Sequence, residues 1–299
     1  MNSALVTIVA ISYNQERYVI DALNSIKNQT YKNIQLIIAD DGSKDNTKQL
    51  ISGWLKDNWP DALFLNHPVN RGVTKNLNSA LPYVKGEFYQ FFGCEDFLLP
   101  KKIELQVNIL INNPDYAIAY SDMYRMDVDG NYFPKTFYTF KDSNVPRTGW
   151  VYDYLLERCF ISTPSALMRS EVVKSLGGDN EKMGVNDYDF WVRASKKFQF
   201  IYHSDVTIEY RVLPTSISAR KGIFVYKNGF LLLYYNYDRR KKYKPIFDKK
   251  MLTGLQMLTN MKYRKTPILA FKAFLKSGKI KFLLKSIQCS PLLLTGKNN

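Results

Sequence analysis

The sequence predicts an α/β fold with a mainly parallel, doubly wound sheet flanked by helices. In the first hundred of its 299 residues, apolar runs of strand length alternate with segments of helical periodicity, which is typical of strand–helix–strand units with right-handed crossovers. The apolar runs also lack alternating polar residues, as expected of parallel strands buried on both faces. We expect these strands at residues 4–12, 34–40, 62–66 and 87–92.

The remaining elements follow from periodicity and turn signals. Val19, Ala22, Leu23 and Ile26 recur at helical spacing between the first two strands. The later part of the chain becomes mostly helical after about residue 218. The other expected elements are a helix after Pro100, a strand at 116–122, a hairpin turn at Asp129-Gly130, a polar flap at 141–147, a strand and short helix within 164–178, and an amphipathic helix at 186–198.

The charge of the chain restricts its partners. The net charge is +15, and the acids lie mainly before Asp189 whereas the bases cluster after it. Such a field attracts phosphorylated ligands, nucleic acid or an anionic membrane surface. We expect no nucleic-acid partner, because the basic runs are not interleaved with aromatic residues that could stack on bases. The basic segment 266–288 is either a helix pair packed on the core or an amphipathic segment lying on anionic lipid.

The cysteines and the apolar runs indicate the compartment. Cys94, Cys159 and Cys289 have no metal-ligand spacing, and their odd number argues against a disulfide framework. We therefore expect a reducing, cytoplasmic environment. We also expect neither a secretion signal nor a membrane span, because no run of about 18 apolar residues occurs.

Polar segments follow each of the four expected strands, at residues 12–16, 40–43, 66–72 and 94–96. Ligands of doubly wound sheets bind outside the carboxyl ends of the strands, so these segments predict one binding edge. The fourth strand ends in two adjacent acids, Glu95 and Asp96. Ionised carboxylates at the end of a buried strand need a cation, a basic side chain or a ligand to compensate them.

Two of these segments have two interpretations each. Asp40 and Asp41 can close a capped strand-to-helix turn, or they can bind ribose hydroxyls or a base N–H. Tyr13 and Asn14 can simply open a helix, or they can offer a base an aromatic stacking surface with polar groups beside it.

Taken together, the motifs resemble those of family 2 glycosyltransferases, which have the GT-A fold. VAISYN, IADDGSKDNT, NRGVTKNLNSALPYVKGE and EDFLLP are similar to the nucleotide-sugar-binding half, and PSALMRSEVVKSLGG and NDYDFWVRA resemble the acceptor-side half. The resemblance covers about residues 4–215. It implies a glycosyltransferase domain at 1–217, made of a donor half (1–100) and an acceptor-side half (101–217). The remaining residues, 218–299, are expected from their own pattern to form a helical, basic region that can associate with a membrane.

The resemblance implies a site for a nucleotide-sugar donor, usually a UDP-sugar in this family. Tyr13 would stack on the base with Asn14 beside it, and Asp41 would hydrogen-bond the base with Asp40 nearby. The further donor-site candidates, each with a surface or capping role as its alternative, are Glu16, Arg71 and Asn78.

The family also carries a DxD-type motif whose last acid holds a divalent cation against the donor phosphates. The matching positions here are Gly93, Cys94 and Glu95, followed by Asp96, so the first acid is missing and the third is glutamate. Mg²⁺ and Mn²⁺ bind carboxylate and phosphate oxygens, and the resemblance therefore implies Glu95 as a ligand. Asp96 is either a second ligand or a cap of the following helix.

Inverting transfer needs a base on the side of the sugar opposite the leaving group. The family's acid pair corresponds to Asn186 and Asp187, which makes Asp187 the implied base. Asp189 is expected to point away from it and to pair with Arg193 one turn on, and Trp191 is expected in the core.

Many relatives carry a histidine at a position occupied here by Leu213. The two histidines, His67 and His203, do not match that motif and are expected to be structural. The nearby bases that could hold the phosphates instead are Arg211, Arg220 and Lys221.

The sequence therefore predicts an inverting glycosyltransferase that moves a hexosyl or N-acetylhexosaminyl group from a nucleotide sugar. The expected acceptor is a saccharide or an undecaprenyl-diphosphate-linked glycan in cell-surface polysaccharide biosynthesis. The altered acidic motif leaves a second interpretation open, a relative that binds nucleotide sugar or a partner without efficient turnover. The basic tail predicts a peripheral position on the inner face of the cell membrane.

Overall fold

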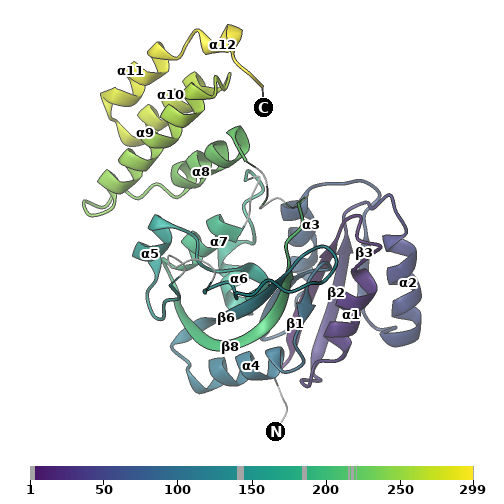
Figure 1. The fold of residues 1–299 in the computed structure, drawn as a ribbon. Coiled ribbons are helices and arrows are strands. Elements are labelled where there is room, and N and C mark those ends of the chain that lie inside the picture. Colours follow the sequence, from purple (N-terminus) through teal and green to yellow (C-terminus); the bar gives the residue numbers. More distant parts are fainter. Residues whose placement is uncertain are drawn as a thin grey trace. The chain divides into compact units, whose positions relative to one another are not determined.

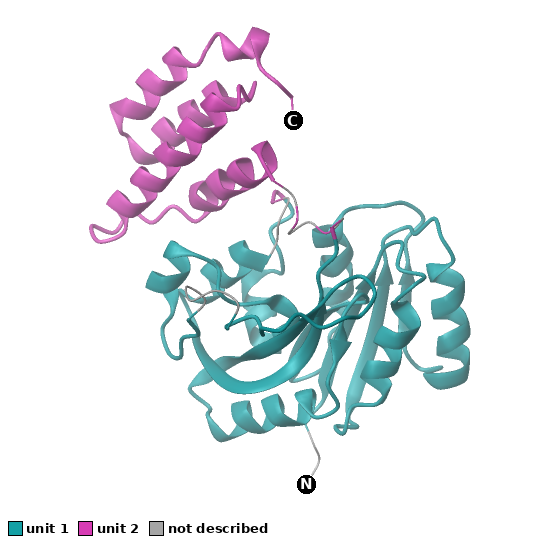
Figure 2. Ribbon diagram, in the orientation of Figure 1, with its two compact units in different colours: residues 1–181, 186–213 teal, residues 182–185, 214–299 magenta. Residues whose placement is uncertain are grey.

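The computed structural model describes residues 4–139, 145–183, 187–214, 216, 219 and 221–298. The chain divides into two compact units, coloured separately in Figure 2. Unit 1 comprises residues 1–181 and 186–213, and unit 2 comprises residues 182–185 and 214–299.

In the described residues, unit 1 is built around one eight-stranded sheet with the strand order β3-β2-β1-β4-β7-β6-β8-β5 (Figure 1). The first four strands of this order are mutually parallel. They are β1 (Val6–Ser12), β2 (Ile34–Asp40), β3 (Leu63–Asn66) and β4 (Phe88–Gly93). Their positions confirm the four expected strands and the predicted fold class.

The other half of the sheet mixes strand directions. Strand β7 pairs antiparallel with both β4 and β6, β8 runs parallel to β6, and β5 pairs antiparallel with β8. These strands are β5 (Phe97–Leu98), β6 (Tyr116–Met126), β7 (Ala166–Arg169) and β8 (Gln199–Arg211). The sequence did not predict β5 or β8.

Helices flank the sheet and close the apolar core (Figure 1). Apolar side chains of β1, β2 and β4 form a core cluster with the buried stripes of α1, α2 and α4. The α-helices of unit 1 are α1 (Val19–Lys27), α2 (Thr47–Asn58), α3 (Val73–Ala80), α4 (Lys102–Asn112), α5 (Tyr152–Glu157), α6 (Ser170–Leu176) and α7 (Asp187–Ala194). In the described part of unit 1, 3₁₀ turns occupy Leu81–Tyr83 and Thr163–Ser165.

Several local predictions can be compared directly with the structure. Gly130 has a φ of 91° in the expected turn, and Met126 and Tyr132 form a bridge around it. Helix α6 ends at Leu176 and is followed by Gly177, whose φ of 66° suits glycine. Helix α7 is shorter than predicted. Most of the expected flap falls on residues 140–144, which lie outside the described residues.

Unit 2 is helical throughout its described elements, as the sequence predicts after residue 218. Its helices are α8 (Ile223–Tyr235), α9 (Lys244–Asn260), α10 (Thr266–Ser277), α11 (Ile280–Gln288) and α12 (Leu292–Thr295). Phe247, Met251, Leu255 and Phe282 are fully buried between these helices. In the described part of the chain, no helix combines the length and the hydrophobicity that a bilayer span requires.

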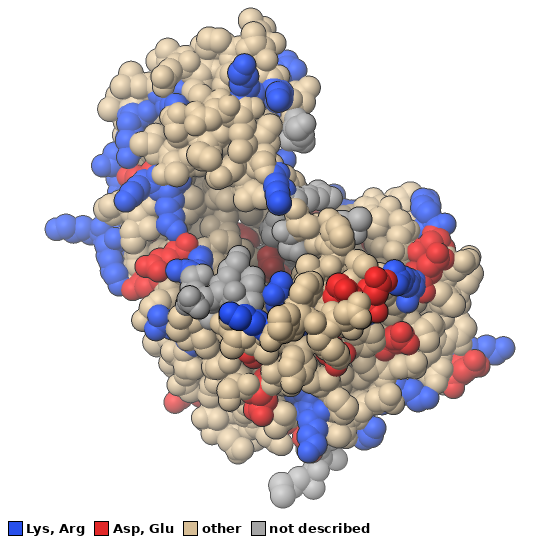
Figure 3. All heavy atoms as spheres, viewed as in Figure 1, with Lys and Arg blue, Asp and Glu red and all other residues tan. Residues whose placement is uncertain are grey.

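The surface of unit 2 is both basic and apolar. Residues 214–299 contain 19 of the 42 lysines and arginines but 2 of the 27 acids, so this segment carries +17 and the rest of the chain −2. In Figure 3, the visible face of unit 2 has a broad uncharged area bordered by lysine and arginine side chains.

Two helices supply exposed apolar stripes to unit 2. On α11, Ile280, Leu284 and Ile287 are 60–62% exposed and follow helical spacing. On α10, the exposed apolar side chains are Ile268, Phe271 and Leu275. Each helix buries other residues against the unit, so these stripes are additional to its core.

Candidate active site

The carboxyl ends of β1, β2 and β4 lie side by side at one edge of the sheet. Ser12 is in register with Asp40, and Ile11 with Gly93. The amide of Asp41 donates to the Ser12 carbonyl at 2.9 Å, and the amide of His67 donates to the Asp40 carbonyl at 3.0 Å. The polar segments that follow the four parallel strands therefore meet at this edge.

Asp40 is fully buried, and both of its carboxylate oxygens accept hydrogen bonds from the protein. Its Oδ2 accepts the hydroxyls of Ser12 at 2.8 Å and Ser43 at 2.5 Å, and its Oδ1 accepts the Ser43 amide at 2.9 Å. The Lys48 ammonium lies 4.0 Å away. These contacts favour the capping interpretation for Asp40 over direct donor binding.

Asp41 fastens a second loop to the edge. Its two carboxylate oxygens accept the amides of Arg71 at 2.7 Å and Gly72 at 2.9 Å. The backbones of the loop after β2 and the loop after β3 approach closely, because a Cβ on Gly42 would lie 2.5 Å from the Val69 carbonyl carbon. Asp41 thus holds the segment that leads into α3.

The segment after β1 is tied to the same loop and leaves one ring exposed. The Asn14 side chain accepts the Lys44 amide at 2.8 Å, and Glu16 Oε2 accepts the Asn46 amide at 2.9 Å. Asn14 has a φ of 53°, and the adjacent Tyr13 is 43% exposed. Tyr13 is therefore available to stack on a planar ligand.

Arg71 and Asn78 differ in their surroundings. The Arg71 guanidinium is exposed and lies 3.3 Å from His67 Nδ1. Asn78 binds both the amide and the carbonyl of Asp179 at 2.9 Å, and its Nδ2 reaches Glu181 at 3.2 Å. Asn78 is therefore a clamp between α3 and the segment after α6, which favours the structural interpretation.

Glu95 follows β4 directly. Gln15 Nε2 donates a hydrogen bond to Glu95 Oε2. A Cβ on Gly93 would lie 2.8 Å from that same oxygen, so the carboxylate folds back over the glycine. Burial raises the pKa of Glu95, while hydrogen bonds from its own backbone and from Gln15 oppose the shift.

Arg211 compensates the two acids at the end of β4. Asp96 is buried and accepts the Arg211 amide at 2.8 Å, while Arg211 Nε donates to the Glu95 carbonyl at 3.2 Å. Burial and the charge of Glu95 raise the pKa of Asp96 well above its usual range. Because its carboxylate binds β8, a structural role is favoured for Asp96 over the predicted metal-ligand role.

The Arg211 side chain also binds other parts of unit 1. Its Nη1 donates to the carbonyls of Asp127 at 3.0 Å and Val128 at 3.2 Å, and its guanidinium lies 4.4 Å from the Tyr18 ring centroid. This geometry disfavours the phosphate contact considered from sequence. Of the other two candidates, Lys221 belongs to unit 2 and Arg220 lies outside the described residues.

Asp187 begins α7 in the acceptor-side half. Its Oδ1 accepts the Tyr188 amide at 2.7 Å, and the Tyr188 hydroxyl donates to the Leu155 carbonyl at 2.6 Å, which fixes α7 to α5. Burial raises the pKa of Asp187. The preceding Asn186, the predicted replacement for the family's glutamate, lies outside the described residues.

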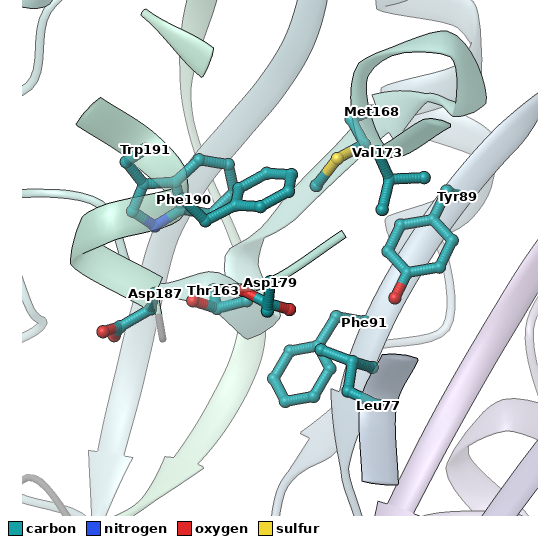
Figure 4. Close-up of a pocket in the computed structure, with 10 residues that line it drawn as sticks. All are labelled: Leu77, Tyr89, Phe91, Thr163, Met168, Val173, Asp179, Asp187, Phe190 and Trp191. Carbon is teal, nitrogen blue, oxygen red and sulfur yellow. The ribbon is translucent and has the colours of Figure 1, made fainter. Parts of the chain in front are cut away.

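A small cavity links Asp187 to β4. Asp187 lines it together with Tyr89 and Phe91 of β4 and Trp191 of α7. In Figure 4 the Asp187 carboxylate points away from these aromatic side chains. The predicted base therefore lies beside the strand whose end carries Glu95.

The structure confirms two subsidiary predictions about α7. Asp189 is buried and pairs with Arg193 at 2.8 Å, and Arg193 also binds the carbonyls of Leu176 and Gly178. Trp191 is fully buried and belongs to the core.

The sheet order, the acids at the strand ends and the antiparallel link through β7 define the GT-A class of nucleotide-sugar-dependent glycosyltransferases. The chain belongs to glycosyl transferase family 2, whose model matches residues 7–177. This match confirms the family that the sequence motifs predict.

Relatives and solved structures agree with this assignment. An uncharacterized glycosyltransferase of Methanocaldococcus jannaschii is 27% identical over 217 residues, covering 71% of this chain and 72% of that protein. An uncharacterized glycosyltransferase of Rickettsia typhi is 30% identical over 220 residues, but the chain covers only 64% of its length. The Escherichia coli UDP-Glc:alpha-D-GlcNAc-diphosphoundecaprenol beta-1,3-glucosyltransferase WfgD is 26% identical over 223 residues, covering 74% of this chain and 82% of WfgD.

Two solved structures share the fold at low sequence identity. S. aureus TarS 1-349 in complex with UDP has a TM-score of 0.62 at 15% identity, covering 98% of this chain and 92% of that one. The mannosyltransferase PcManGT of Pyrobaculum calidifontis, in complex with GDP-Man and Mn²⁺, has a TM-score of 0.61 at 17% identity, covering 98% of this chain and 86% of that one.

Sequence reasoning missed Gln15, which binds the carboxylate of Glu95. Gln15 lies in the segment after β1 that was singled out, but an uncharged amide carries no signal for a charged site. Pairing residues 12–16 with 94–96 across neighbouring strand ends would have found it.

Proposed function

We propose that this protein is an inverting glycosyltransferase that moves a sugar from a UDP-sugar to a hydroxyl of a saccharide or lipid-linked acceptor. The observation that carries the proposal is the gathering of the donor-side segments at one sheet edge, with Asp187 beside β4 in a family 2 chain. The UDP and UDP-GlcNAc complexes of TarS and the UDP-Glc named for WfgD support a uridine donor.

At the donor end, the exposed ring of Tyr13 would stack on uracil. Asp40, Asp41, Asn14 and Glu16 would act mainly by holding the loops around it, because their side chains already bind neighbouring backbone amides. The exposed guanidinium of Arg71 would reach toward the phosphates. Asn78 would support this wall from behind through its clamp on Asp179.

A divalent cation, Mn²⁺ or Mg²⁺, fits the end of β4 only with help from the substrate. In the described residues, no group of three acidic, histidine or cysteine side chains could hold a metal alone. Glu95 supplies a carboxylate, and the donor diphosphate and water would supply the other oxygens that such a cation needs. When bound, the cation neutralises charge that develops on the departing diphosphate.

Asp187 would act as the base. In the transfer, the acceptor oxygen bonds to the anomeric carbon, the bond from that carbon to the diphosphate oxygen breaks, and UDP leaves with the electron pair. The acceptor proton passes to the Asp187 carboxylate. The backbone bond from Tyr188 and the anchoring of α7 on α5 hold that carboxylate in place.

The decisive experiment combines a UDP-sugar panel with an Asp187→Asn variant. Removing the proton acceptor should reduce transfer by about 100- to 10,000-fold while UDP affinity stays unchanged. Transfer would be followed by mass spectrometry with cell-envelope lipid extract as acceptor, and UDP binding by calorimetry. Undiminished transfer by this variant would contradict the proposed base.

The panel also separates a relative without turnover from an active enzyme. Metal-linked UDP binding combined with no transfer or hydrolysis of any panel member would favour the non-catalytic alternative. The absent first acid of the cation motif is the observation behind that alternative.

We further propose that the enzyme works on the inner face of the cell membrane, on a glycan carried by undecaprenyl diphosphate. WfgD is named for such a diphosphoundecaprenol substrate. The basic charge of unit 2 and the exposed apolar stripes of α10 and α11 suit an anionic lipid surface. The expected role is cell-surface polysaccharide synthesis.

A further inference from the structure

We propose that Gln15, Gly93 and Glu95 together replace the two-acid cation motif of the family, with Gln15 as a positioning residue and oxygen donor of the cation site. The inference rests on the proposed use of a divalent cation. It concerns how this chain retains such a site after losing the first acid of the motif.

Gly93 provides the room that the replacement needs. Glutamate is one methylene longer than aspartate, so its carboxylate must be accommodated differently at the end of β4. The space beside the Gly93 Cα is filled by that carboxylate, because an added Cβ would lie 2.8 Å from Oε2 and 3.0 Å from the carboxyl carbon. An acid at position 93 and this conformation of Glu95 therefore exclude each other.

Gln15 fixes the carboxylate from the neighbouring strand end. Its backbone amide donates to the hydroxyl of Thr47, the first residue of α2, at 2.8 Å, so its backbone is held. Its side-chain nitrogen then donates to Glu95 Oε2. The nitrogen must face the carboxylate, because an amide oxygen in that place would repel it.

This orientation settles where the other end of the Gln15 amide lies. The side-chain oxygen shares a carbon with the donating nitrogen, so it lies near the end of β4 on the same amide group that holds Glu95. It is buried and has no hydrogen-bond partner among the residues that the structure describes. An unpaired buried carbonyl is costly, and hard cations and their water ligands bind such oxygens.

Glu95 and Gln15 together offer a cation the two oxygen ligands that the two acids of the family motif would provide. Glu95 contributes the negative charge, and Gln15 contributes a second oxygen without the repulsion that a second carboxylate would add. Asp96 already places a second carboxylate next to Glu95, and Arg211 is bonded to both residues, so a neutral partner adds less repulsion at the end of β4 than another acid would.

The test is calorimetric titration of the full chain with UDP, with and without Mn²⁺, which needs no turnover. Gln15→Leu should reduce the gain in UDP affinity that Mn²⁺ provides by about 10- to 100-fold, the usual effect of removing a supporting residue from a metal site. Gly93→Ala should do the same by displacing the Glu95 carboxylate. UDP affinity without Mn²⁺ should stay within about twofold of the wild type, since neither residue is expected to contact the base.

Two further variants sharpen the comparison. Gln15→Glu loses the N–H that holds Glu95 but keeps an oxygen donor, and Mn²⁺ bound between the two carboxylates would offset their repulsion. This variant should therefore retain most of the Mn²⁺ effect, which separates an oxygen donor from a mere hydrogen-bond support. Gln49→Leu makes the same change at an exposed position of α2 and should behave as the wild type.

The outcomes distinguish this inference from the proposed function. A wild-type Mn²⁺ effect that persists in both Gln15→Leu and Gly93→Ala would overturn the inference and leave the enzyme's cation dependence intact. Loss of the effect in Gln15→Glu as well would overturn the oxygen-donor role. No Mn²⁺ effect in the wild-type protein would overturn both the inference and the proposed cation.

Discussion

At the residue scale, acids that look equivalent in the sequence have different surroundings. Asp40, Asp41 and Asp96 are buried, and their oxygens accept hydrogen bonds from neighbouring backbone amides. Glu95 binds a side-chain amide, and Asp187 binds the amide that follows it in its own helix. The first group shapes the edge of the sheet, whereas Glu95 and Asp187 are the better candidates for contacts with ligands.

The raised pKa of Asp187 has a consequence for the pH dependence of transfer. A base acts only when it is deprotonated, so kcat/KM should rise with pH through the Asp187 pKa. Because burial raises that pKa, the midpoint of this rise should lie above the ordinary aspartate value of about 3.9. Rate measurements between pH 4 and pH 8 at saturating Mn²⁺ would locate it.

Glu95 also has a raised pKa, so its titration must be separated from that of Asp187. UDP affinity measured over the same pH range in the Asp187→Asn variant reports Glu95 without the base. A rise in kcat/KM that matches the UDP-binding profile in every detail would count against Asp187 as the titrating group.

At the scale of elements, helix α4 is attached to the sheet through a buried lysine. The Lys102 side-chain nitrogen is fully buried and donates to the side-chain oxygens of Gln90 on β4 and Gln106 one turn along α4. Gln106 in turn donates to the Ser165 carbonyl at 2.8 Å. Burial lowers the pKa of Lys102 well below its usual range.

This lysine makes stability depend on pH in a specific direction. Between the lowered pKa in the folded chain and the value of about 10.4 in the unfolded chain, the unfolded state binds more protons, so stability rises with pH. The Tm of the wild type should therefore increase relative to that of Lys102→Met as pH rises from 7 to 9.5. Thermal unfolding at several pH values measures this difference, and parallel Tm curves would refute it.

Elements also mark the limit of what the sequence could predict. The parallel strands were predictable because both faces are buried and their apolar runs are continuous. Strand β8 was not, since its middle residues His203, Ser204 and Asp205 are polar and its pairing with β6 is interrupted by register shifts. Gln15 and Gly93 escaped for a related reason, because their roles depend on a contact between separate strand ends.

At the scale of the whole molecule, charge and chemistry are divided between the two units. Unit 1 contains the sheet edge and the described part of the candidate site, and its basic and acidic residues are nearly equal in number. Unit 2 holds the excess of basic residues, and no acid follows Asp248. The sequence predicted this division, but it could not decide whether 266–288 packs on the core or lies on anionic lipid. In the structure α10 and α11 each bury some residues and expose an apolar stripe, so lipid contact stays a prediction.

The division predicts membrane binding that depends on both kinds of side chain. Leu275→Ser/Leu284→Ser/Ile287→Ser should weaken sedimentation of the full chain with phosphatidylglycerol vesicles by about 10-fold or more, because apolar area is lost from the lipid contact. Lys272→Glu/Lys279→Glu/Lys281→Glu should weaken it by a similar factor of about 10 or more. Binding to vesicles of phosphatidylcholine alone should be weak for every variant, and added salt should reduce the wild-type binding to anionic vesicles.

Matched changes in unit 1 provide the controls. Ile111 is 52% exposed on α4, and Lys56 is exposed on α2, so Ile111→Ser and Lys56→Glu should bind vesicles as the wild type does. Unchanged sedimentation of both triple variants would rule out this surface as the lipid contact. A different outcome is that the protein does not bind vesicles but forms a defined dimer in solution, and that the apolar substitutions abolish this dimer. That result would assign the stripes to contact with a second copy of the chain. If the protein binds RNA as tightly as anionic vesicles, and the apolar substitutions do not weaken this RNA binding, then charge alone causes the binding. The membrane proposal would then fail.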